Sequence, residues 1–194
     1  MRTCAFDGVF STEPRSHPWT DAASDAACVY YDLKATPARI RTSLEDLVPW
    51  ARYAAVDALY GLLEWLNGPR SPLESNDCAF SGPHDNDSRE IEAALGCSGR
   101  VMVLFRDLAR NVAEVEVMRL ENDLHRALGS LDPGLAWGMV GTTRVPVRYL
   151  DLPAGQQLGQ QLMISFWSWG DSEAEVMKNL ARVIACLSKA LEAS

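Results

Sequence analysis

The side chains with the most chemical potential lie in one acidic segment. Between Glu74 and Glu92 the sequence holds six acids and one base, Arg89. Hard cations take several oxygen ligands from a tight turn, and the run from Asp85 to Asp87 offers such oxygens. The segment lacks the glycine and the spacing of an EF-hand loop, so we assign no metal ligand. Two interpretations stay open: an anionic surface that docks on a basic partner, and a loop that is simply solvated.

The same segment offers a nucleophile. A thiolate needs a nearby base, and acyl transfer also needs oxyanion donors. Cys78 and His84 supply the first two groups, but no catalytic signature surrounds Cys78. The phosphate-binding motif G-x-x-x-x-G-K-[ST] and the dinucleotide-binding motif G-x-G-x-x-G do not occur in the sequence. We therefore predict no cofactor, and catalysis is the weaker hypothesis.

Two further groups of side chains deserve a functional interpretation. Arg144 and Arg148 are four residues apart, so they project from the same face of a predicted strand and could hold a phosphate or a carboxylate. Charges on an edge strand also prevent aggregation, and we favour that explanation. Trp167 and Trp169 share one face of another predicted strand, while Phe166 points to the opposite face. The tryptophans could anchor a partner or a second copy of the chain, although packing in the core is more common.

The predicted binding surface combines the acidic segment with the arginine pair. Its residues are Glu74, Asp77, His84, Asp85, Asp87, Glu90, Arg144 and Arg148.

Composition narrows the class of protein. The 194 residues are 47% hydrophobic and 23% charged, which is ordinary for a globular domain. The net charge of −8 opposes binding to a nucleic-acid backbone. Five cysteines without a C-x-x-C pair indicate free thiols in a reducing compartment. With no secretion signal and no apolar stretch long enough for a membrane span, the cytoplasm is the expected location.

The hydrophobic pattern predicts the elements that position these residues. Strands are expected at 27–33, 101–105 and 161–169, and a hairpin at 135–140 and 144–150 that turns at Gly141-Thr142-Thr143. Because Pro146 cannot donate a hydrogen bond, the second hairpin strand should lie at an edge. Helices are expected at about 47–66, 109–128 and 173–191. Capping boxes are predicted at Thr42–Glu45 and Ser172–Glu175.

Together these elements predict a single α+β domain over residues 1–194. An antiparallel sheet of about four to five strands would pack against three main helices, and a ferredoxin-like arrangement fits the C-terminal half. Residues 1–26 should be loosely ordered, and residues 71–99 should form an irregular acidic loop.

The functional hypothesis is a non-enzymatic intracellular protein that binds another protein. An acidic inhibitor or immunity-type protein that docks on a basic surface is its concrete form. The alternative is a small enzyme or ligand-binding domain with a site near Cys78 and His84, where Arg106 would converge on them. Homo-oligomerisation also stays open.

Overall fold

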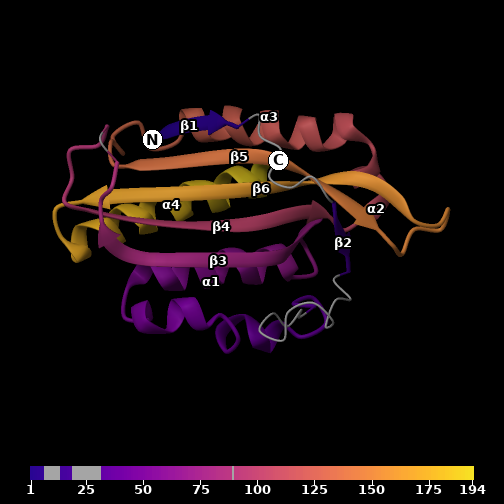
Figure 1. Ribbon diagram of the computed structural model, residues 1–194, viewed down its shortest axis with the longest axis horizontal. Coiled ribbons are helices and arrows are strands. Elements are labelled where there is room, and N and C mark those ends of the chain that lie inside the picture. The colour runs from indigo at the N-terminus through magenta and orange to yellow at the C-terminus, as the bar shows by residue number, and fades with distance from the viewer. Residues whose placement is uncertain (7–13, 19–31, 89) are drawn as a thin grey trace.

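The computed structural model describes residues 1–6, 14–18, 32–88 and 90–194, and this part of the chain forms one mixed β-sheet with its long helices on one face (Figure 1). The strands are β1 (Arg2–Ala5), β2 (Arg15–His17), β3 (Leu73–Asp85), β4 (Leu95–Phe105), β5 (Gly138–Tyr149) and β6 (Gln157–Gly170). The helices are two 3-10 helices, η1 (Pro37–Arg41) and η2 (Glu45–Trp50), and the α-helices α1 (Ala54–Asn67), α2 (Leu108–Val112), α3 (Glu114–Ser130) and α4 (Glu173–Ala193).

The α+β class is as predicted, but the sheet is larger than expected and it is not purely antiparallel. Its order is β1-β5-β6-β4-β3, and β2 also pairs with β5. The pairs β3–β4, β4–β6 and β5–β6 are antiparallel, whereas β1 and β2 both run parallel to β5. The described strands therefore number six rather than four or five.

The C-terminal half contains a crossover between two parallel strands. Because β4 and β5 each pair antiparallel with β6, they run parallel to one another on its two sides. The chain passes from β4 to β5 through α2 and α3. A ferredoxin-like unit has this arrangement in its first three strands. The position beside β4 is held here by β3, which comes earlier in the chain.

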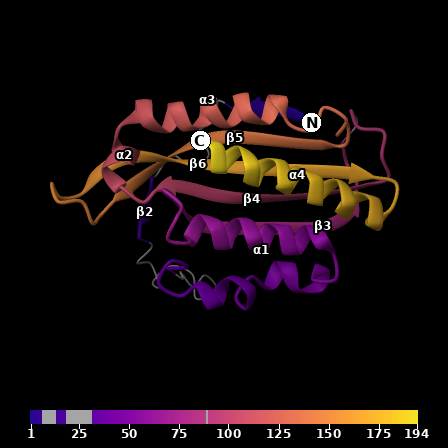
Figure 2. The ribbon, with the colours of Figure 1, turned by 180° about the vertical axis from the view of Figure 1, so that it is seen from behind.

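The core lies between the sheet and the three long helices α1, α3 and α4, which cover the same face (Figure 2). Alternate residues of β6 supply one side of this core, with Leu162, Ile164 and Phe166 all 0% exposed. Helix α4 crosses them with its buried apolar stripe. Ser172 caps α4 by accepting a hydrogen bond from the backbone N–H of Glu175 at 3.3 Å, as the second capping box predicted.

The first capping box is wrong. The α-helix begins at Ala54, and residues Glu45–Trp50 form the separate helix η2. Pro49 cannot donate a hydrogen bond within an α-helix, which explains the break. The hydroxyl of Thr42 instead donates to the carbonyl of Ala38.

The predicted irregular loop at 71–99 contains β3 and the start of β4, which form a long hairpin. Two irregularities interrupt its register, between Ser75 and Asp77 and between Ser81 and His84. The polar residues, Gly82 and Pro83 are typical of a loop, so the sequence did not indicate a strand here. A strand can contain them because bulges at the edge of a sheet tolerate such residues.

The predicted hairpin at 135–150 is also wrong, because Gly138–Tyr149 is one continuous strand. Strand β5 is not at the edge either. β1 pairs with residues 139–142 and β2 with residues 147–149, and Pro146 lies in the gap between them. Pro146 therefore does not have to donate a hydrogen bond to either of these two strands.

Two other predictions concern the N-terminal part. The strand expected at 27–33 lies mostly outside the described residues. In the segment expected to be loosely ordered, residues Arg2–Ala5 and Arg15–His17 are strands of the sheet. Among the described residues, no helix combines the length and the apolar character that crossing a membrane requires.

Candidate functional site

The face of the sheet opposite the long helices carries a group of solvent-accessible side chains that could bind another molecule. Strands β3, β4 and β6 face the viewer in Figure 1, and the long helices α1, α3 and α4 lie behind the sheet. Trp167 points to this face and Phe166 to the core, as their alternation predicted. A shallow depression of about 300 Å³ lies on this face. Its lining residues are Ala79, Phe80, Ser81, Ser98, Gly99, Arg100, Met163, Ser165 and Trp167.

Asp77 lies beside the depression and is already paired. Its Oδ2 atom is 3.4 Å from Nη2 of Arg100 and 3.4 Å from Nη1 of Arg15. The Asp77 side chain is only 16% exposed. Asp77 therefore fixes two guanidinium groups on this face and offers little free charge to a partner.

The turn between β3 and β4 presents the acids that are free. Asp85, Asp87 and Glu90 are exposed, and none forms an ion pair within the part of the chain that the structure describes. His84 is exposed as well, and its Nδ1 atom lies 2.8 Å from the carbonyl oxygen of Gly82. These four predicted site residues therefore lie together at one end of the sheet.

A second acidic turn meets the first one, which the sequence did not reveal. The backbone N–H of Ala94 donates to Oδ1 of Asp171 at 3.2 Å, so the β6–α4 turn lies against the β3–β4 turn. Glu175 is partly accounted for by capping, because its Oε2 atom accepts a hydrogen bond from the N–H of Asp171. Glu173 contacts Arg52 and Tyr53. We call Asp85, Asp87, Glu90 and Asp171 the acidic end.

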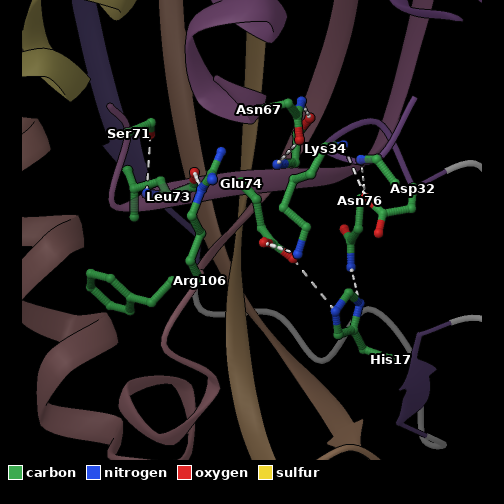
Figure 3. A network of polar contacts seen from close by, with 12 residues as sticks. His17, Asp32, Lys34, Asn67, Ser71, Leu73, Glu74, Asn76 and Arg106 are labelled. Atoms are coloured by element: carbon green, nitrogen blue, oxygen red, sulfur yellow. Dashed lines mark hydrogen bonds and ion pairs between the residues drawn. The ribbon is translucent and has the colours of Figure 1, made fainter. Parts of the chain in front are cut away.

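Glu74 lies elsewhere and is buried. It is 2% exposed, its Oε2 atom is 2.5 Å from Nζ of Lys34, and its Oε1 atom is 3.7 Å from Nε2 of His17 (Figure 3). The sequence prediction placed Glu74 on a binding surface, but a partner could reach this carboxylate only by displacing the side chains around it. A surface acid and a buried acid look alike in sequence when the partner, Lys34, comes from a distant segment.

His17 completes this buried cluster in its neutral form. Nδ2 of Asn76 lies 3.2 Å from Nδ1 of His17 and 2.9 Å from Oε1 of Gln161. Because the amide donates to Nδ1, the ring hydrogen lies on Nε2, toward Glu74. Burial, and secondarily the charge of Lys34, lower the pKa of His17 to about 4. The cluster links His17 of β2 and Lys34 to the strands β3 and β6.

The arginine pair is separate from the acidic end. Nε of Arg144 lies 3.2 Å from Glu121, and Nη1 lies 3.1 Å from Glu114. Arg144 therefore helps to hold α3 on β5, and it does not protect an edge strand. Arg148 is half-buried further along β5.

The structure does not bring together the residues of the enzymatic alternative. Arg106 donates to the carbonyls of Leu66, Gly68 and Leu73, which closes the C-terminal end of α1. Leu73 pairs with Phe105 at one end of the β3–β4 ladder, and His84 pairs with Gly96 at the other. Burial raises the pKa of Cys78 to about 12, which opposes a thiolate.

No cluster of three or more His, Cys, Asp or Glu side chains suited to a metal ion occurs among the residues placed by the structure. The depression and the acidic end together present carboxylates, hydroxyls, a guanidinium and an indole.

No model of a known protein family matches the chain, and no curated protein and no solved structure matches it.

Proposed function

We propose that this protein is non-enzymatic and binds another protein that has a basic surface. The observation that carries the proposal is the acidic end, where Asp85, Asp87 and Glu90 are exposed without ion-pair partners in the described structure. It borders a sheet face on which Trp167 and Arg100 are partly exposed. Tryptophan and arginine are enriched among the residues that dominate binding energy at protein interfaces.

Unpaired acids at one end of a molecule favour association with a basic surface. Like charges held close together repel one another, and a basic partner relieves that repulsion. The resulting field also accelerates encounter with a partner of opposite charge. These effects support an inhibitor that covers a basic cleft, and an immunity-type inhibitor of a nuclease is the concrete version that we propose.

The cysteines support a location for this activity. Cys4, Cys78, Cys97 and Cys186 are free thiols in the described structure. Free buried thiols are usual where the compartment is reducing. We therefore place the inhibitor in the cytoplasm.

Affinity capture from a native lysate with the full chain as bait tests this function. The informative variant is Asp87→Asn/Glu90→Gln, and its matched control is Asp151→Asn/Glu192→Gln, which removes the same charge from exposed positions after β5 and on α4. Wild type and control should retain a basic protein that the Asp87/Glu90 variant loses, and retention should fall as salt rises. A partner retained equally by all three chains at every salt concentration would show that the acidic end is not the binding surface.

A further inference from the structure

The depression on the uncovered sheet face has a definite origin in the strand register. Ser81, Ser98 and Trp167 form one row across β3, β4 and β6, and Ala79, Arg100 and Ser165 form the next. Each row has one large side chain and two small ones, and the large ones, Trp167 on β6 and Arg100 on β4, are diagonal neighbours on adjacent strands. The small side chains leave a hollow between the indole and the guanidinium.

Trp167 forms one wall of this hollow, and its ring packs against a residue outside the hollow. The Phe6 ring meets the Trp167 ring edge to face, with centroids 6.1 Å apart and an interplanar angle of 69°. Phe6 fits there because Gly141 has no side chain, and a Cβ atom at that position would lie 2.4 Å from the Phe6 ring. A side chain held in this way loses less conformational freedom on binding, so Trp167 is suited to anchor a contact.

The size and chemistry of the hollow favour one inserted side chain. Its volume of about 300 Å³ is at the lower end of ligand pockets, which span about 300–1,000 Å³, and it is shallow and open. Its walls are mostly apolar. The hydroxyls of Ser98 and Ser165 form no hydrogen bond within the described part of the chain, so they can bind the backbone of an incoming segment. Arg100 is ion-paired with Asp77, which makes it less available to a free anion.

We propose that the depression receives one large apolar side chain of a partner protein, from a segment that also carries lysine or arginine about 10 Å away. This spacing follows from β4, on which Ser98 lies in the depression and Leu95 pairs with Asp85 at the acidic end. Three residues of a strand span that separation. The inference rests on the proposed function, and it names the partner chemistry for that same surface.

Selection from a display library of random linear peptides, with the full chain as bait, tests the inference. Enriched peptides should share one large apolar residue with lysine or arginine two to four residues away. Ser98→Trp fills the hollow and should weaken synthetic copies of these peptides about tenfold or more. Its matched control is Ser130→Trp, at the exposed end of α3, which should leave binding unchanged. Circular dichroism and thermal unfolding confirm that both variants are folded.

The charged half of the proposal has its own measurement. Asp87→Asn/Glu90→Gln should weaken the same peptides several-fold and flatten the dependence of affinity on salt. Failure to enrich any peptide overturns the inference, and so does enrichment of acidic sequences or an equal affinity for wild type and Ser98→Trp. If wild type self-associates in light scattering and Ser98→Trp does not, a second copy of the chain is the occupant and the inference is also overturned.

These outcomes are separable from those of the proposed function. If a captured basic protein is lost by the Asp87/Glu90 variant and kept by folded Ser98→Trp, the protein-binding function stands and the anchor site is wrong. If peptides bind as expected and no basic protein depends on the acidic end, the anchor chemistry stands and the proposed inhibitor function fails.

Discussion

Lys34 lies with its Nζ atom 2.5 Å from Oε2 of Glu74, and this joins a segment before the first helices to the edge strand β3. Glu74 is 3% exposed at its side chain, whereas Lys34 is 37% exposed. The pair is therefore a buried carboxylate closed by a lysine that keeps partial access to solvent. The contact stabilises the fold because Lys34 provides a countercharge to a carboxylate that would otherwise be buried without one.

Removing the lysine should be costly. Lys34→Met leaves the Glu74 carboxylate without its main countercharge, and losing one partner of a fully buried pair costs about 3–5 kcal/mol. Because water reaches Lys34, we expect about 2 kcal/mol here, measured as a lower midpoint of urea unfolding. The double variant Lys34→Met/Glu74→Leu should recover part of that loss. A double variant less stable than Lys34→Met would show that Glu74 stabilises the fold through contacts other than Lys34.

The histidine of the same cluster predicts a dependence of stability on pH. His17 has a pKa of about 4 in the folded protein and about 6.5 when unfolded, so the folded state binds its proton more weakly. The contribution of His17 to the free energy of unfolding is fully present above pH 6.5 and is lost as the pH falls toward 4. The loss approaches about 3 kcal/mol at the lower limit. Unfolding midpoints of wild type and His17→Gln should converge between pH 7 and 4, and parallel pH profiles would contradict the assignment.

The cysteines should differ in reactivity between the folded and unfolded states. Burial raises the pKa of Cys78 to about 12 and that of Cys97 to about 11. Since the thiolate is the reactive form, neither should be alkylated by iodoacetamide at pH 8 until the protein unfolds. Mass spectrometry of native and urea-unfolded samples checks this. Rapid native alkylation of Cys78 would revive the nucleophilic alternative.

The elements that could be predicted from sequence are those with strong local signals. Helix α4 has a Ser172 cap and a regular apolar stripe, and the buried strand at Val101–Phe105 is a continuous apolar run. The short strands β1 and β2 have no such signal, because they are defined by parallel pairing with β5, which is more than a hundred residues away in the sequence. Local pattern cannot encode that register.

The candidate site shows the same division. The acidic turn at Asp85 and Asp87 is visible as composition, and the alternation of Trp167 with Phe166 follows from strand geometry. The depression required the register of three strands, and Asp171 joins the acidic end only through the meeting of two distant turns. Glu74 was grouped with the surface acids, since the sequence gives no sign that Lys34 covers it.

Two adjacent threonines on β5 provide an internally controlled prediction about packing of α3. The hydroxyl of Thr142 donates to Oε1 of Glu121 at 2.7 Å and lies 2.7 Å from Nε2 of His125. Thr143 is equally buried, and its hydroxyl has no hydrogen-bond partner in the described structure. Both residues accept the same nearly isosteric change to valine.

Thr142→Val should destabilise the protein by about 1–3 kcal/mol, because Glu121 is 8% exposed and loses a hydrogen bond that water cannot easily replace. Thr143→Val should be neutral or stabilising by up to about 1 kcal/mol, because it removes an unpaired buried hydroxyl. Urea unfolding of the two variants and wild type gives the comparison. Equal destabilisation by both variants would mean that strand packing, and not the contact with α3, determines the effect at this position.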